Sequence, residues 1–153
     1  MLIEHIETEI TTDISPEVNN CFNLLKSELE KKSYIVSMGE MKLVTKLQPG
    51  RVVVNIDRDF SMDKNGENKK SETFKVSFQS SVYDLAKIAN EIASQESKYC
   101  NFNELGFMMI YRDYDITKDR TSSDDLIYSV EKINTDQKFI FGIKSCSMPG
   151  GLA

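Results

Sequence analysis

The spacing of apolar positions in residues 1–48 predicts a strand followed by a helix. Residues 2–9 alternate apolar and polar positions only roughly, which indicates a strand. Ser15 before Pro16 is typical of a helix start, because proline lacks an N–H group that the first turn leaves unpaired anyway. Apolar residues then recur at steps of three and four and form one helical face: Val18, Cys21, Phe22, Leu25 and Leu29.

The middle of the chain predicts extended structure around a long loop. Residues 34–47 read as extended, and Pro49–Gly50 ends them with a turn. Residues 52–57 and 74–78 alternate apolar and polar positions and predict two strands. The hydrophilic residues between these strands predict a long loop with Asn65–Gly66 at its tip, because this dipeptide readily takes the positive φ angles of a hairpin turn.

The last part predicts a second helix and further strands. Ser81, with a carboxylate three residues later, predicts the helix start. One helical face is apolar: Val82, Leu85, Ile88, Ala89 and Ile92. Residues 107–111 predict a compact apolar strand, and the polar residues 113–125 lead to a short apolar turn at 126–127. Residues 138–144 predict the last strand, so the fold class is α+β.

The composition and net charge argue against several classes of function. The 153 residues include 19 Lys and Arg against 24 Asp and Glu, a net charge of −5. Because affinity for nucleic acid comes from excess Lys and Arg, we expect no nucleic-acid partner. One histidine, His5, and three cysteines would nearly all be needed for a usual zinc site. We therefore expect no metal, no cofactor and no catalytic set, and a protein that is not an enzyme.

The N-terminus and the cysteines bear on location. The first residues lack a basic region followed by a long apolar run, so we expect no signal peptide. No segment approaches the ~18 apolar residues of a membrane span, so we expect no membrane contact. Cys21, Cys100 and Cys146 are widely spaced and odd in number, which suits free thiols in a reducing compartment. These observations predict a cytoplasmic protein.

Two glycines, Gly150 and Gly151, precede Leu152–Ala153 at the end of the chain. Glycine has no side chain, so a Gly–Gly tail can enter a narrow active site of another enzyme and present a carboxylate there. An ordinary disordered end explains the same residues. The dipeptide alone leaves both interpretations open.

Several segments resemble ubiquitin. Residues 109–111, followed at the matching distance by 119–124 and 126–127, resemble the part of ubiquitin between its third strand and the turn before its last strand. Residues 138–144 and the later Gly150–Gly151 resemble its last strand and tail. The helix positions Val82, Leu85 and Ile88 also match the ubiquitin helix.

The resemblance implies a ubiquitin-like β-grasp at residues 49–147 with a flexible Gly-Gly tail at 148–153. Residues 1–48 have no ubiquitin counterpart, and we expect them to form an N-terminal β-α-β extension or a partial second lobe. An added N-terminal portion is similar to that of bacterial ubiquitin-like proteins found in antiphage conjugation operons.

The resemblance also implies a function as a protein modifier. A JAB-like peptidase would remove Leu152–Ala153, and an activating enzyme would adenylate the carboxylate of Gly151. A conjugating enzyme would then form an isopeptide bond with a lysine of a target protein. Ile110 matches the exposed isoleucine through which ubiquitin binds its partners, and Ile140 would extend this partner-binding patch.

Three alternatives stay open beside this hypothesis. Ile110 and Ile140 could both belong to the core, because periodicity alone does not assign an apolar strand to one face. The protein could be a small acidic inhibitor or immunity-type module that binds another protein non-covalently. It could also be a sulfur-carrier protein, since those carriers end in Gly-Gly as well.

Overall fold

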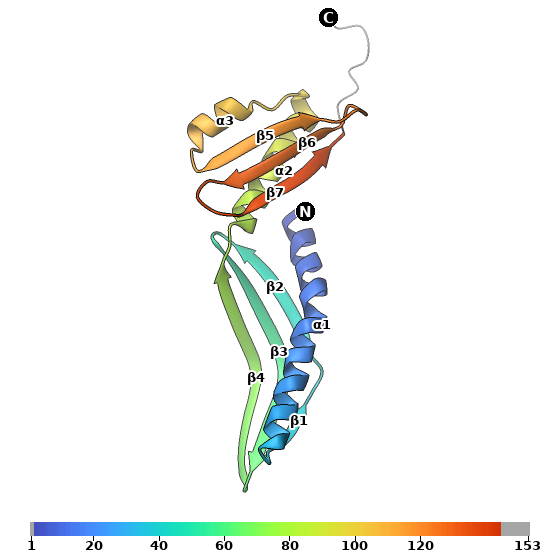
Figure 1. Cartoon of the computed structure of the whole chain (residues 1–153), viewed down its shortest axis with the longest axis vertical. Coiled ribbons are helices and arrows are strands. Elements are labelled where there is room, and N and C mark those ends of the chain that lie inside the picture. Colours follow the sequence, from blue (N-terminus) through green and yellow to red (C-terminus); the bar gives the residue numbers. More distant parts are fainter. Residues whose placement is uncertain (1, 145–153) are drawn as a thin grey trace, which may run out of the picture. The chain divides into compact units, whose positions relative to one another are not determined.

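The computed structural model describes residues 2–144, which contain helices and strands in both halves of the chain (Figure 1). The chain divides into two compact units, Met1–Gln79 and Ser80–Ala153. We call them the first and the second unit. Each unit has its own antiparallel sheet and at least one helix. The predicted α+β class is therefore confirmed.

The first unit begins with one long helix, α1 (Leu2–Lys31). The strand predicted at 2–9 and the helix start predicted at Ser15 are both wrong, because the apolar spacing of three and four already begins at Ile3. Pro16 lies inside the helix and is exposed. The Ser15 hydroxyl does not cap the helix but donates to the Thr11 carbonyl at 2.6 Å.

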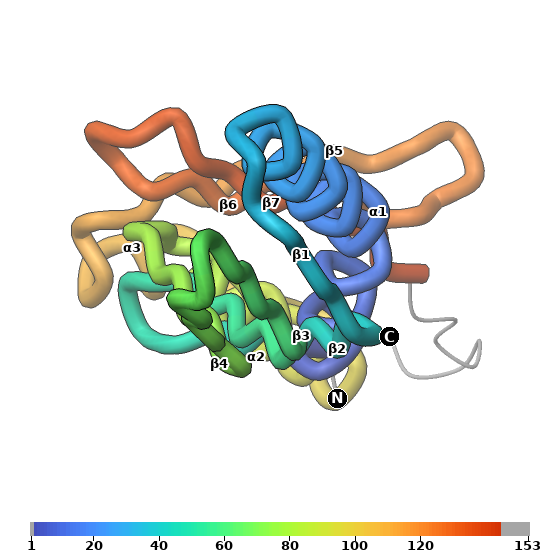
Figure 2. The backbone as a smooth tube through the Cα atoms, turned by 90° about the horizontal axis from the view of Figure 1, so that it is seen from below, coloured from blue at the N-terminus to red at the C-terminus, as the bar shows by residue number. Residues whose placement is uncertain are grey.

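Four strands follow and form the sheet of the first unit: β1 (Ile35–Met38), β2 (Lys42–Gln48), β3 (Arg51–Lys64) and β4 (Glu67–Gln79). β3 is central; β1 and β2 pair with its two halves on one side, and β4 pairs with it on the other (Figures 1 and 2). We predicted a long loop between these strands. Instead, β3 and β4 continue as a hairpin up to the turn at Asn65–Gly66. This turn has the predicted positive φ angles of 56° and 86°.

The predicted boundary between residues 1–48 and 49–147 falls inside a hairpin. Leu47 of β2 pairs with Val52 of β3 across the turn at Pro49–Gly50. A division there would separate hydrogen-bonded strands. The boundary between the two compact units follows Gln79 in the sequence instead. The N-terminal segment is also not β-α-β, since it starts with α1 and continues into β1 and β2.

The core of the first unit lies where α1 covers β1 and β2. Phe22 of α1 sits at its centre, with its ring 6.3 Å from Phe60 and 5.3 Å from Phe74. The Arg58 guanidinium lies 5.0 Å above the Phe22 ring and donates to the Asn19 side chain. Besides Phe22 and Phe60, the buried apolar residues of this unit all belong to the sheet: Val36, Leu43, Leu47, Val52, Val53, Val54 and Ile56.

The second unit packs two helices on a sheet of order β5-β6-β7. Its elements are α2 (Val82–Tyr99), α3 (Glu104–Ile110), β5 (Tyr114–Arg120), β6 (Leu126–Lys132) and β7 (Lys138–Ile143). The predicted second helix and last strand are confirmed. The Ser81 hydroxyl makes no cap hydrogen bond; the Gln137 side chain accepts from the Ser81 N–H at 2.5 Å.

Two predictions in the second unit are wrong. Residues 107–111 belong mainly to α3, which Asn103 caps by accepting from the Gly106 N–H at 2.9 Å. An apolar run of this length fits a buried strand or a helix equally well, so only the cap distinguishes them. The residues predicted as a polar turn with a short apolar segment form β5 and β6.

These strand pairings bear on the predicted β-grasp. The β3–β4 hairpin pairs with β1 and β2, whereas the last strand, β7, pairs with β6 in the second unit's sheet. A β-grasp at 49–147 would place the hairpin and the last strand in one sheet. The β-grasp is therefore not confirmed.

The core of the second unit lies between α2 and the sheet. Phe102, in the link between the helices, places its ring 6.0 Å from Tyr128. The other buried members are Leu85, Ile88, Ile92, Ile116, Leu126 and Val130. This core fixes α2 on one face of the sheet, and no helix within residues 80–144 covers the opposite face.

None of the helices in the described range is long and apolar enough to cross a membrane. Cys21 is a free, exposed cysteine as expected, but Cys100 is disulfide-bonded, so the free-thiol expectation is wrong for Cys100. Cys146, Gly150 and Gly151 lie outside the described residues.

Candidate interaction surface

The structure separates the two isoleucines that we expected to form one patch. Ile110 lies at the end of α3 and is 75 % exposed, and Ile140 lies on β7 and is 57 % exposed. Phe139 and Phe141 pack against the core cluster, so Ile140 between them points to the opposite face of the sheet. Neither isoleucine is a core residue, and they do not share one surface.

Ile110 belongs to a group of exposed apolar side chains on and beside α3, which we call the α3 surface. Its members are Leu105, Met109, Ile110 and Tyr111. The first three are each more than 70 % exposed. Sequence reasoning missed Leu105 and Met109 because it placed this segment in a strand; Asn103 before an acidic first turn was the available signal.

Two other side chains anchor α3 to its unit. The Phe107 ring lies 5.6 Å from Phe102 and stacks on Tyr111 at 4.4 Å. The sulfur of Met108 accepts from the Ile116 N–H of β5 at 3.2 Å. Since the contacts of Phe107 with Phe102 and of Met108 with Ile116 hold the helix in place, the outward side chains of Leu105, Met109 and Ile110 are not needed to fix it.

A groove of about 550 Å³ runs between α2 and α3. Its apolar lining includes Ile88 and Ile110, and its polar rim includes Asp84, Lys87 and Glu91. Burial raises the pKa of the Tyr114 hydroxyl in this groove, and the nearby carboxylates of Asp84 and Asp113 raise it further. The groove therefore combines an apolar floor with a rim on which carboxylates outnumber ammonium groups.

The second unit also contains a buried polar network beneath α2. Glu96 is 2 % exposed and its Oε1 accepts from the Lys118 ammonium at 2.8 Å and from the Tyr128 hydroxyl. Burial opposes the Glu96 charge, but the hydrogen bonds from Lys118 and Tyr128 and the Lys118 charge outweigh it, so the pKa of Glu96 is lowered. Burial and the bond to Glu96 raise the pKa of Tyr128 to about 12.

We interpret this network as one that stabilises the second unit, because its members satisfy one another's hydrogen bonds and charges. A general acid or base works best with a pKa near the working pH. The pKa values of Glu96 and Tyr128 both move away from neutrality. The pKa of Lys118 also rises: burial opposes its charge, but the bonds to Glu96 and Tyr128 outweigh that effect.

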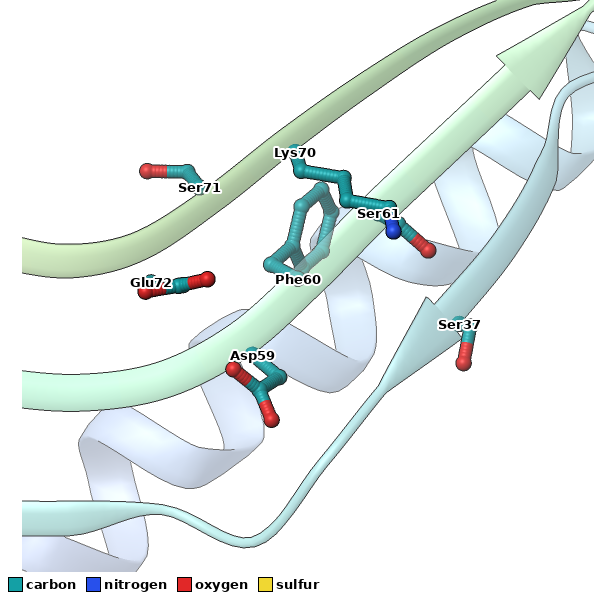
Figure 3. A pocket seen from close by; sticks show the side chains of 7 residues that line it. All are labelled: Ser37, Asp59, Phe60, Ser61, Lys70, Ser71 and Glu72. Carbon is teal, nitrogen blue, oxygen red and sulfur yellow. The ribbon is translucent and has the colours of Figure 1, made fainter.

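The first unit has a shallow hollow of about 300 Å³ at the irregularity in β3–β4 pairing (Figure 3). Asp59, Lys70 and Glu72 line it and are exposed. Across residues 2–144, no three His, Cys, Asp or Glu side chains are placed to hold a metal ion. The charged groups of this hollow are already hydrated, so a ligand would gain little by replacing that water.

Comparison with known proteins adds no assignment: the chain matches no protein-family model, no curated protein and no solved structure.

Proposed function

We propose that this protein acts by binding another protein non-covalently, and that the α3 surface makes the contact. The observation that carries this proposal is the exposure of Leu105, Met109 and Ile110 on one short helix. Scattered exposed apolar residues are ordinary, but three on one short helix, of which Ile110 lines a groove and Leu105 and Met109 line a neighbouring hollow, are typical of an interaction site.

The energetics favour a partner at this surface. Burial of one Leu, Ile or Met side chain is worth about 1.5–3 kcal/mol. Three such side chains would contribute on the order of 5 kcal/mol before the cost of association is subtracted. Because Phe107 and Met108 already anchor α3, binding needs no rearrangement of the helix.

The groove indicates the kind of partner. A cleft between two helices with an apolar floor suits an amphipathic helix that inserts apolar side chains at helical spacing. Asp84 and Glu91 on the rim favour Lys or Arg at the flanks of that helix. We therefore propose a partner segment that is apolar on one face and basic at its edges.

The test compares cross-linked partners of three full-length proteins in an extract of the source cells. Wild type, Ile110→Asp and Ile140→Asp are used, since both isoleucines are exposed and neither substitution disturbs a core. We expect a partner that wild type and Ile140→Asp retain and Ile110→Asp loses. Its affinity, measured with purified proteins, should fall at least about tenfold for Ile110→Asp, the loss of roughly 1.4 kcal/mol. Equal affinity of all three proteins would reject the α3 surface.

A second candidate function is the conjugated modifier, with the β-grasp and partners described above. Gly150–Gly151, close behind the confirmed strand Lys138–Ile143, favours it. The test is incubation with the JAB-like peptidase, the activating and conjugating enzymes, ATP and a sulfur donor, followed by mass spectrometry. Loss of Leu152–Ala153 and a bond from Gly151 to lysine would support it, and a thiocarboxylate on Gly151 would indicate a sulfur carrier. Identical behaviour of Gly151→Ala would reject both.

A further inference from the structure

The sheet of the first unit has β2 at one edge and β4 at another. Side chains of α1 form hydrogen bonds with the β2 edge. Glu7 Oε1 accepts from the Leu47 N–H at 2.9 Å, and Thr11 Oγ1 accepts from the Thr45 N–H at 3.0 Å. Glu7 Oε2 also binds the Lys46 ammonium at 2.8 Å. An edge whose outward N–H groups are already bonded to side chains cannot accept another strand.

No side chain within residues 2–144 protects the β4 edge in this way. Among the described residues, β4 pairs with β3 alone, and it runs for 13 residues. Figure 1 shows it at the margin of the sheet, on the side away from α1. Only Ser71 and Phe74 are partly buried; Val76 and Phe78 are 53 % and 52 % exposed. A long edge strand with exposed apolar side chains is a template for pairing with another strand.

The apolar residues of this edge are arranged symmetrically. The segment from Phe74 to Phe78 reads Phe-Lys-Val-Ser-Phe, with Val76 at its centre. Its three apolar residues lie opposite three buried residues of β3, namely Ile56, Val54 and Val52. The apolar stripe therefore continues the core face of the sheet to the open edge.

We propose that two copies of this chain associate through their β4 edges. The strands run antiparallel, with Val76 opposite Val76 on the two-fold axis. Phe74 of each copy then lies opposite Phe78 of the other, and Lys75 lies opposite Ser77. Apolar and aromatic cross-strand pairs stabilise an antiparallel pair, and a two-fold interface requires this kind of self-complementary pattern.

Other registers of the same two strands are less favourable. A pairing centred on Glu72 or on Lys75 places like charges directly opposite each other, which destabilises a sheet. One centred on Phe74 sets Glu72 against Val76 and Lys70 against Phe78. One centred on Ser71 forms opposite-charge pairs but leaves Val76 and Phe78 outside the paired region. Only the register centred on Val76 places Phe74, Val76 and Phe78 all opposite apolar residues, and it does so without a charge conflict.

The first test is sedimentation equilibrium of the full chain, wild type against Val76→Lys. We expect wild type to be dimeric, and we expect Val76→Lys to dimerise at least about tenfold more weakly, because two ammonium groups would meet on the axis. Ile35→Lys is the matched control, since Ile35 is 76 % exposed on β1; it should remain dimeric. A wild type that stays monomeric, a trimer, or a dimer that Val76→Lys does not weaken would overturn the proposal.

The second test fixes the register even if Val76→Lys folds poorly. In a Cys21→Ser background, Val76→Cys should form an intermolecular disulfide, because directly opposite residues have Cα atoms about 4.5–5.5 Å apart. Ser71→Cys should not, since its copies would be ten residues apart along the strands. Cross-linking through Ser71→Cys, or none through Val76→Cys, would overturn the proposed register. Neither test involves the α3 surface, so this proposal stands apart from the proposed function.

Discussion

Replacement of Lys118 by methionine tests the role assigned to the Glu96–Lys118–Tyr128 network. The substitution keeps the length of the side chain but removes the ammonium that lies 2.8 Å from Glu96 Oε1. The Glu96 side chain is 3 % exposed, so its carboxylate stays buried. It then lacks the positive charge that offsets its loss of hydration. Removal of one partner from a buried pair costs about 3–5 kcal/mol.

We expect the lower end of that range, about 3 kcal/mol, for Lys118→Met. The reason is that the Lys118 side chain is itself 22 % exposed, so water already screens part of the pair. Urea unfolding followed by tyrosine fluorescence measures the loss. All tyrosines except Tyr34 lie in the second unit, so this signal reports mainly on the unit that contains the network.

The effect of Lys118→Met should depend on pH in a defined direction. In the wild type the pKa of Glu96 is lowered, so its contribution to stability is present above the ordinary value of about 4.3 and is lost as pH falls through the folded value. Without Lys118, burial is less opposed and the pKa of Glu96 rises. A protonated Glu96 needs no cation, so the difference between the two proteins should shrink in acid.

A surface lysine of the same sheet provides the control. Lys138 lies on β7 and is exposed, so Lys138→Met should change the free energy of unfolding by no more than about 0.5 kcal/mol. The reasoning is refuted if Lys118→Met behaves like Lys138→Met at neutral pH, or if its deficit is the same at neutral and acid pH.

Three further predictions concern local structure. Asn103→Ala should destabilise the second unit by about 1 kcal/mol, because the cap at the start of α3 is lost; urea unfolding measures it. Gly66→Ala should destabilise the first unit by about 1 kcal/mol, since Gly66 has a φ of 86°, whereas Asn68→Ala on β4 should have little effect. Glu7→Ala should speed hydrogen exchange at the Leu47 amide more than at the Val52 amide, because Leu47 loses its acceptor; unchanged exchange at Leu47 would contradict the edge protection by α1.

The elements predicted correctly are those with a strong local period. The apolar face of α2 and the alternation in β3, β4 and β7 are visible without knowledge of their neighbours. The turn at Asn65–Gly66 was also correct, since its residue types match its φ angles.

The elements predicted wrongly carry local signals that fit more than one structure, and tertiary contacts decide between them. The first turns of α1 carry Thr and Ile, which are modest helix formers, and contacts of Glu7 and Thr11 with β2 support them. The sequence did not predict β5, because the charged Lys118 interrupts the alternation of apolar and polar positions. Lys118 occupies an inward position since it pairs with Glu96 on α2. For α3, the apolar run 107–111 fits either structure, and the outward direction of Met109 and Ile110 follows only from the helix.

Oxidation of Met109 tests the proposed binding function most directly. Met109 is 76 % exposed, so its oxidation by a brief peroxide or radical pulse should be fast in the purified protein. Met41 of the first unit, which is only partly exposed, serves as the internal reference. We expect Met109 to oxidise several-fold more slowly, relative to Met41, in an extract of the source cells than in the purified protein. An unchanged ratio of the two rates would contradict the proposal that a partner covers the α3 surface.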